Sequence, residues 1–171
     1  SAENLAAPLL KRLKFDEKKL NEVVDGIHSL IGLDDPVGKT LLARELDDGM
    51  KLCRVSCPIG VIGIIFESRP DALVQISTLC LKSGNAVLLK GGREAALTNR
   101  ILVQVIEEAS MEAGMPDHWI NLLESREEVN EMLALDEYVD LIIPRGSNQF
   151  VRYIMDNSRI PVLGHADGIC H

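Results

Sequence analysis

Short apolar runs and amphipathic segments alternate along most of this chain. The runs at residues 61–66 and 86–89 are rich in β-branched and aliphatic side chains, which is typical of strands buried on both faces of a sheet. Apolar positions between them recur every three or four residues, which predicts a helix that begins at Pro70 and ends in the turn at residues 83–85. Two buried strands joined by a helix form a right-handed crossover, so we expect these strands to be parallel.

The same alternation continues toward the C-terminus. A helical stripe ends at Gly114, and Ser125 with Glu128 has the spacing of a capping box that begins another helix. The expected elements are a helix at 95–113, a strand at 120–123, a helix after Ser125, a strand at 141–143, a helix at 149–157 and a strand at 160–163. Five strands that alternate with four helices predict an α/β fold with a doubly wound parallel sheet.

Two helices are predicted ahead of this domain. They cover residues 3–14 and 16–31, and Asp16 has the side chain of an N-cap. Because the chain starts on a helix without a lead-in, we expect it to be part of a longer protein.

Residues 41–46 and 50–55 flank an Asp-Asp-Gly turn, which predicts a β-hairpin. The hairpin falls outside the alternating pattern, so we expect an antiparallel ribbon that serves as an interaction arm. The chain then divides into N-terminal helices (1–40), a ribbon for oligomerisation (41–57) and an α/β domain (58–171).

Composition and charge exclude several classes of protein. No apolar run approaches the roughly 20 residues that span a bilayer, and the first residues lack the features of a signal peptide, so we expect a cytoplasmic protein without membrane contact. A net charge of −8 gives no support for binding a phosphate backbone, so no nucleic-acid partner is expected. The four cysteines lack a second pair at zinc-ligand spacing, which indicates buried free thiols and no metal site.

Polar side chains cluster where the strand at 61–66 ends. Glu67, Ser68 and Arg69 follow this strand, and ligands of open α/β sheets bind outside the carboxyl ends of the strands. The guanidinium of Arg69 can form two parallel hydrogen bonds with a carboxylate or a phosphate, although an arginine at a helix start is also an ordinary surface residue. Glu67 is either part of such a site or the salt-bridge partner of Arg69.

A basic glycine turn follows the next strand. Lys90, Gly91, Gly92 and Arg93 precede a helix, the free N–H groups at a helix start attract anions, and glycines let a ligand approach the backbone closely. We therefore predict binding of a phosphate-bearing ligand here. Taken alone, however, a Lys-Gly-Gly sequence is more often just a turn.

Arg145, Gly146 and Ser147 repeat the arrangement after the strand at 141–143. Two such turns at one edge of a sheet strengthen the prediction of an anion site. The chain contains neither a Gly-x-Gly-x-x-Gly sequence nor a P-loop, so the ordinary Rossmann and nucleotide triphosphatase interpretations lack their fingerprints.

Two further candidates lie near the C-terminus. His165 is in a polar turn after the last strand, where a general acid or base can sit, but a loop histidine without a catalytic role fits equally. Cys170 and His171 are adjacent in sequence, whereas a nucleophile and its base are normally distant in the chain. We therefore do not expect Cys170 to be a nucleophile.

Several of these segments together carry a family resemblance. They are Asp35-Pro36-Val37-Gly38, Phe66-Glu67-Ser68-Arg69-Pro70, Leu88-Leu89-Lys90-Gly91-Gly92, Ile143-Pro144-Arg145-Gly146-Ser147 and Leu163-Gly164-His165-Ala166-Asp167-Gly168. In this combination the sequence resembles the γ-glutamyl phosphate reductases, also called glutamate-5-semialdehyde dehydrogenases, of the aldehyde dehydrogenase superfamily. The reductase half of pyrroline-5-carboxylate synthases is the same module.

The resemblance implies a reaction and a cofactor. These enzymes use NADPH to reduce L-glutamyl 5-phosphate to L-glutamate 5-semialdehyde, with release of phosphate, in proline biosynthesis. A cysteine thiolate attacks the acyl phosphate, and a hydride then reduces the thioester. By this resemblance Lys90 meets the adenosine ribose or its 2′-phosphate, the turn at residues 144–147 lies near the pyrophosphate, and Arg69 contacts the substrate. His165 falls near the place of the superfamily's general base.

The resemblance also implies what this chain does not contain. The nucleophilic cysteine is expected beyond His171 in a separate catalytic domain, so the chain alone is expected to be inactive. The full protein is expected to form a homo-oligomer through its ribbon, with glutamate 5-kinase as a pathway or fused partner. The alternative is a noncatalytic binding or assembly module of the same fold that uses the ribbon for partner contacts.

Overall fold

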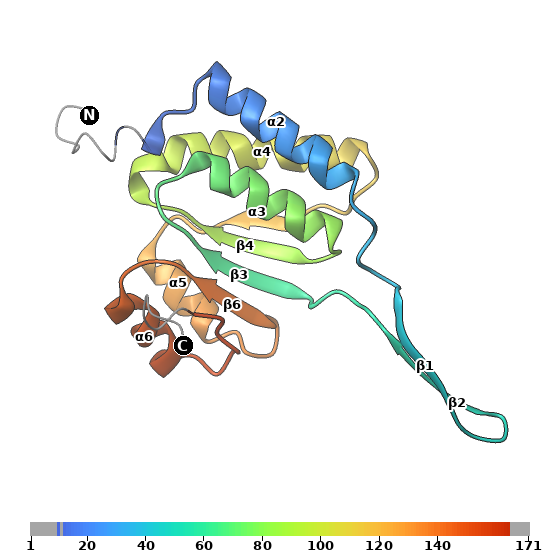
Figure 1. The fold of residues 1–171 in the computed structure, drawn as a ribbon. Coiled ribbons are helices and arrows are strands. Elements are labelled where there is room, and N and C mark those ends of the chain that lie inside the picture. The colour runs from blue at the N-terminus through green and yellow to red at the C-terminus, as the bar shows by residue number, and fades with distance from the viewer. Residues whose placement is uncertain (1–9, 11, 165–171) are drawn as a thin grey trace.

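The computed structural model describes residues 10 and 12–164, and a parallel sheet of four strands lies at its centre (Figure 1). The strands lie in the order β5–β4–β3–β6, and their bounds are β3 Val61–Ile65, β4 Ala86–Lys90, β5 Ile120–Leu122 and β6 Leu141–Pro144. All three pairings are parallel, as predicted. The expected strand at 160–163 is reduced to a single bridge between Val162 and Ile142.

Helices cover both faces of this sheet. The helices on one face are α2 Glu17–Ile31, α3 Pro70–Lys82 and α4 Ala96–Glu112, with the short 3₁₀-helix η2 Arg93–Ala95 before α4; those on the other face are α5 Arg126–Leu133 and α6 Asn148–Asn157. Successive side chains of β3 point to opposite faces, so Ile62 and Ile64 enter the core beneath α3, whereas Ile65 enters the core beneath α5 and α6. The prediction of a doubly wound α/β sheet is confirmed.

Local capping sets the ends of these helices. Asp16 accepts a hydrogen bond from the Lys19 N–H at the start of α2, and Ser125 and Glu128 form the complete capping box of α5. Pro70 occupies the first turn of α3, where its missing N–H leaves no gap in the helix. The predicted helix at 3–14 falls mostly outside the described residues. None of the described helices combines the length and apolar character needed to cross a bilayer.

The entry to β3 is held by two polar side chains from distant segments. Asn85 Oδ1 accepts hydrogen bonds from the N–H groups of Ile59 and Gly60, at 2.7 and 2.9 Å. Asp140 Oδ2 accepts from the Val61 N–H at 2.8 Å. Gly60 has a φ of 128°, and a Cβ there would overlap Asp140, so only glycine fits this entry.

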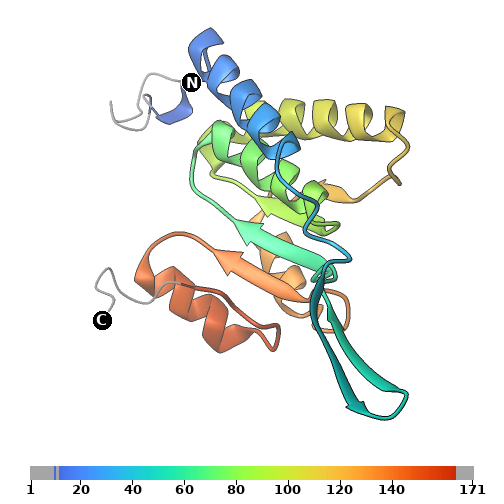
Figure 2. The same cartoon turned by 45° about the vertical axis from the view of Figure 1, so that its right-hand side comes forward.

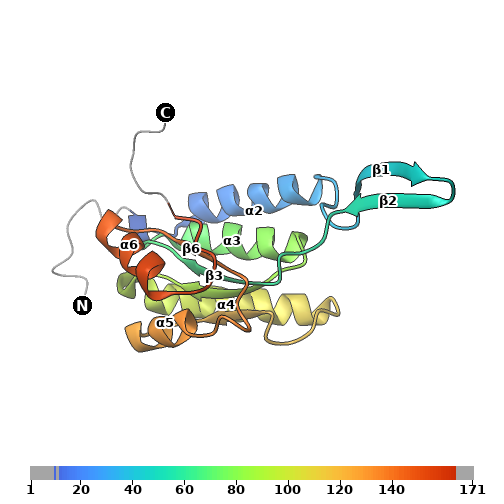
Figure 3. The ribbon, with the colours of Figure 1, turned by 90° about the horizontal axis from the view of Figure 1, so that it is seen from below.

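The predicted hairpin is present and leaves the body of the molecule (Figures 1 and 2). Its strands, β1 Thr40–Asp47 and β2 Met50–Val55, pair in antiparallel register, and every residue in both is exposed. Gly49 has a φ of 75°, as the Asp-Gly turn requires. Seen from below, the ribbon extends past the ends of α2 and α3 (Figure 3).

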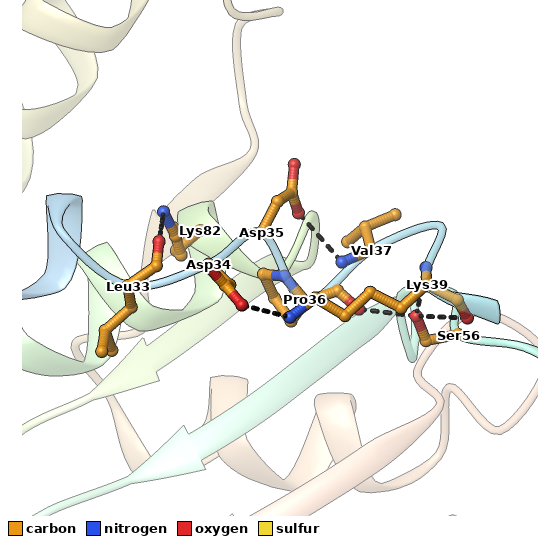
Figure 4. Close-up of polar contacts among 8 residues, drawn as sticks. All are labelled: Leu33, Asp34, Asp35, Pro36, Val37, Lys39, Ser56 and Lys82. Atoms are coloured by element: carbon orange, nitrogen blue, oxygen red, sulfur yellow. Dashed lines mark hydrogen bonds and ion pairs between the residues drawn. The ribbon is translucent and has the colours of Figure 1, made fainter. Parts of the chain in front are cut away.

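A cluster of hydrogen bonds fixes the base of this ribbon (Figure 4). The Ser56 hydroxyl donates to the Pro36 carbonyl at 2.6 Å and accepts from the Lys39 N–H at 2.9 Å, which joins the two ends of the hairpin. Lys82 Nζ, at the end of α3, donates to the Leu33 carbonyl at 2.8 Å. The ribbon is therefore anchored to the helical layer through the linker that follows α2.

Candidate functional site

The strand order places a ligand-binding edge beside β3. The chain moves from β3 to β4 and β5 in one direction, and then returns to place β6 on the opposite side of β3. The carboxyl ends of β3 and β6 therefore meet at a topological switch point, which is where open α/β sheets bind their ligands. The predicted clusters Glu67–Arg69 and Arg145–Ser147 both lie at this edge, next to the turn that follows β4.

The loops after β3 and β4 are tied together through Ser68. Its hydroxyl donates a hydrogen bond of 2.7 Å to Glu94 Oε2, and the Phe66 N–H donates to the Lys90 carbonyl at 2.9 Å. The bond from Ser68 holds the pKa of the Glu94 carboxyl below its ordinary value. Ser68 thus joins two loops, and its hydroxyl is already engaged there.

Close packing between these loops explains the two glycines of the Lys-Gly-Gly turn. A Cβ at Gly92 would overlap the Ser68 hydroxyl, and a Cβ at Gly91 would overlap the Asn99 amide and lie 3.1 Å from Phe66. The side chain of Asn99 is buried, and its Oδ1 has no hydrogen-bond partner within the described part of the chain. The glycines are required by protein packing, and this requirement holds whether or not a ligand approaches them.

Lys90 lies at the mouth of a cavity on the α5–α6 side of the sheet. The cavity has a volume of about 530 Å³, and its lining includes Lys90, Gly91, Gly92, Ile65, Phe66, Arg126, Val129, Asn130, Phe150 and Tyr153; we call it the α5–α6 cavity. Lys90 Nζ donates to the Gly91 carbonyl at 2.8 Å. Burial lowers the pKa of the Lys90 ammonium, the nearby charges of Arg93 and Arg126 lower it further, and the carboxylates of Glu128 and Glu94 raise it. A bound anion would stabilise the ammonium in the same way as these two carboxylates.

The other residues predicted after β3 have different partners from those expected. Glu67 pairs with Arg12 at 3.1 Å and not with Arg69, so the alternative in which Glu67 is the salt-bridge partner of Arg69 is wrong. Arg69 instead pairs at 3.0 Å with the buried Asp71, which also lies 3.5 Å from Lys19. Burial acts to raise the pKa of Asp71, but its bond and charge interaction with Arg69 hold that pKa below its ordinary value. The Arg69 side chain remains 54% exposed, so its other N–H groups can reach a ligand.

The turn after β6 opens α6. Ser147 is the N-cap, and its hydroxyl accepts from the Phe150 N–H at 3.3 Å, while the Arg145 N–H donates to the Ile65 carbonyl at 2.8 Å.

Arg145 lines a second cavity of about 600 Å³ on the α3 side of the sheet. Arg93 lines a third, of about 60 Å³, which it shares with Lys90 but which is separate from the α5–α6 cavity. His165 lies outside the described residues.

Comparison with known proteins identifies the family. A model described as "Aldehyde dehydrogenase family" matches residues 9–163. The chain belongs to the aldehyde dehydrogenase family. Membership of this family implies a nicotinamide cofactor.

Other aldehyde dehydrogenase family members resemble the chain over nearly its whole length. The γ-glutamyl phosphate reductase of Ruminiclostridium cellulolyticum is 76% identical over 169 residues, which are 99% of this chain and 39% of that protein. Crystal structures of γ-glutamyl phosphate reductases are similar too. The one from Thermotoga maritima has a TM-score of 0.89 at 39% identity, covering 94% of this chain and 39% of its own. The one from Saccharomyces cerevisiae has a TM-score of 0.84 at 48% identity, covering 98% of this chain and 43% of its own.

The α5–α6 cavity fits the cofactor that the aldehyde dehydrogenase family implies. Its volume falls within the roughly 300–1,000 Å³ of small-molecule sites, and the rings of Phe150 and Tyr153 offer apolar surface to a base. Lys90 and Arg126 supply positive charge for phosphate groups. The Tyr153 hydroxyl donates to Asn130 Oδ1 at 3.2 Å, which connects α6 to α5 across the cavity.

Sequence reasoning missed the half of this cavity that α5 and α6 contribute. Arg126 was assigned only to a helix start, and Phe150 and Tyr153 only to the body of a helix. The spacing of the two aromatic residues by three does place both on one side of α6. No local signal shows that this side faces Lys90, since their nearness depends on how α6 packs against the sheet.

Proposed function

We propose that the protein to which this chain belongs reduces L-glutamyl 5-phosphate to L-glutamate 5-semialdehyde with NADPH and releases phosphate, a step of proline biosynthesis. In this proposal glutamate 5-kinase supplies the substrate, and the chain provides the cofactor-binding part. The relatives at 74–76% identity, all named γ-glutamyl phosphate reductase, support the reaction. The observation that supports the cofactor role is the α5–α6 cavity, where Lys90 meets aromatic walls.

Four of the predicted site residues have roles in this proposal. Lys90 binds the adenosine ribose or its 2′-phosphate, and the α6 start at Gly146 and Ser147 offers backbone donors to the pyrophosphate. NADPH, when bound, supplies the hydride that reduces the acyl group. Arg69 binds the substrate phosphate or carboxylate, held in place by Asp71.

The described cysteines lack the features of a thioester-forming nucleophile. Such a nucleophile needs a lowered pKa and a position beside the nicotinamide. Burial instead raises the pKa of the Cys80 thiol to about 11, in the core beneath α3. Cys53 is on the exposed ribbon and Cys57 is exposed just beyond its end, so the prediction of burial is wrong for both. Cys170 lies outside the described residues, and the sequence does not favour it as a nucleophile. We therefore assign the nucleophile to a part of the full protein outside this chain.

Cofactor binding by this chain is tested with a matched pair of lysine variants. In isothermal titration calorimetry with NADPH, Lys90→Met is expected to weaken binding by about 10- to 100-fold, because a charged hydrogen bond contributes about 1.5–3 kcal/mol. Lys18→Met, which removes an exposed lysine on α2, is the control and should leave affinity unchanged. Equal affinity of the two variants would exclude Lys90 from the cofactor site.

The reaction itself is tested in the full-length protein. Phosphate-dependent reduction of NADP⁺ by glutamate 5-semialdehyde, the reverse direction, is expected there and not in the 171-residue chain. Turnover by the short chain that disappears on Cys170→Ser would make Cys170 the nucleophile and overturn the assignment above.

The exposed ribbon favours a second candidate function, that of a noncatalytic assembly module. Every residue of β1 and β2 is exposed, and a two-stranded ribbon has two edges with unpaired backbone groups. The two candidates differ in one measurement. A cofactor domain binds NADPH through Lys90, whereas a module that only assembles shows no NADPH binding.

A further inference from the structure

Three cations gather where β4 ends. Lys90 is the last residue of β4, Arg93 begins η2, and Arg126 is the first residue of α5. The two arginines lower the pKa of Lys90, whereas the carboxylates of Glu128 and Glu94 raise it. Like charges repel, so an anion bound among the three cations would stabilise the cluster further.

The carboxylates of Glu128 and Glu94 offset part of this positive charge through space, but the contacts that they make are with other groups. Glu128 Oε2 accepts hydrogen bonds from the Ser125 and Glu124 N–H groups, at 2.8 and 2.6 Å, as part of the capping box. Glu94 accepts from Ser68. Within residues 10 and 12–164, none of the three cations takes part in a salt bridge.

The cavities distinguish the two arginines. Arg126 lines the α5–α6 cavity together with Lys90 and the rings of Phe150 and Tyr153. Arg93 lines the neighbouring cavity of about 60 Å³, which is too small for a nucleotide, and it is not among the residues that line the α5–α6 cavity. A ligand that lies against the two rings therefore has Lys90 and Arg126 within its own cavity, and Arg93 outside it.

We infer that Arg126 is a specificity-determining residue that, with Lys90, binds the 2′-phosphate of NADPH, so that the protein distinguishes NADPH from NADH. The inference rests on the proposed function. A guanidinium binds a phosphate monoester through two parallel hydrogen bonds, whereas the 2′-hydroxyl of NADH offers it no charge.

The test is a set of dissociation constants for the full-length protein with NADPH, NADH, adenosine 2′,5′-bisphosphate and adenosine 5′-monophosphate. Arg126→Gln should weaken binding of the two 2′-phosphorylated ligands by about 10- to 100-fold and change the other two by less than about threefold. Arg126→Lys should recover part of the lost affinity, because lysine restores the positive charge but not the two parallel N–H donors of the guanidinium. Arg152→Gln on α6, an exposed arginine outside the cavity, is the matched control.

Each other outcome has a definite meaning. An equal loss for NADPH and NADH in Arg126→Gln would show a general structural effect and overturn the inference. Arg93→Gln alone abolishing the preference would assign the role to Arg93 instead. If the unaltered protein binds NADPH and NADH equally, the inference fails while nucleotide binding stands; if it binds neither, the proposed cofactor role fails as well. Circular dichroism of each variant shows whether it is folded.

Discussion

Replacing Gly92 by alanine tests whether the hydrogen bond from Ser68 to Glu94 holds the loops after β3 and β4 together. Gly92 has φ −64° and ψ 147°, which any residue adopts, so the backbone adds no strain. The added Cβ would overlap the Ser68 hydroxyl and lie 2.9 Å from Glu94 Oε2. The hydroxyl must therefore move and give up its bond to Glu94.

The expected costs follow from these contacts. Ser68→Ala removes one hydrogen bond to an exposed carboxylate and should lower the free energy of unfolding by about 1 kcal/mol. Gly92→Ala should lower it by about 2–4 kcal/mol, since overpacking alone costs about 1–3 kcal/mol and the same hydrogen bond is lost. In the double variant the hydroxyl is gone, and the two Cβ atoms would lie about 3.1 Å apart. The double variant should therefore lose less stability than the two single variants lose in sum, by about 1 kcal/mol or more.

Urea unfolding of the four proteins in this double-mutant cycle measures the coupling directly. Gly26→Ala is the control, because a Cβ at this position in α2 meets nothing within 4 Å and should stabilise the helix by about 1 kcal/mol. If the free-energy costs of the two single substitutions add up to the cost of the double substitution within about 0.5 kcal/mol, the proposed interaction between Gly92 and Ser68 is refuted.

Four further outcomes are expected. Asn85→Ala should destabilise the protein by about 2–4 kcal/mol in urea unfolding, because two backbone N–H groups lose their acceptor, and Asn85→Asp should cost clearly less because it keeps that acceptor. Burial raises the pKa of the Cys80 thiol from 9.0 to about 11, so the thiol ionises first in the unfolded chain. Between about pH 9 and 11 stability should therefore fall more steeply in the unaltered protein than in Cys80→Ala. At pH 8, mass spectrometry should find that iodoacetamide alkylates the exposed Cys53 far faster than Cys80. The full-length protein should self-associate through its ribbon in light scattering, and Leu41→Lys with Leu46→Lys on exposed β1 should weaken this; a monomer at micromolar concentration would leave the ribbon without that role.

Short-range patterns in the sequence predicted the elements of this fold. Pro70 at a helix start, Gly84 with a φ of 72° at the end of the same helix, and the capping box at Ser125 each act over a few residues. Alternation of these elements predicted the doubly wound sheet, because buried parallel strands need helices on both faces. The edge of the sheet that carries the candidate site followed from the same reasoning.

Only the tertiary structure decided which side chains meet at that edge. Glu67 pairs with Arg12, 55 residues away, although Arg69 is nearer in sequence. Arg126 shares a cavity with Lys90 because α5 and α6 cover the face of the sheet on which that cavity opens, while Arg93, three residues from Lys90, points into another. Such contacts depend on the strand order and on the rotation of each helix about its axis. Packing of the whole core sets both, and no sequence pattern near the contacting residues reveals them.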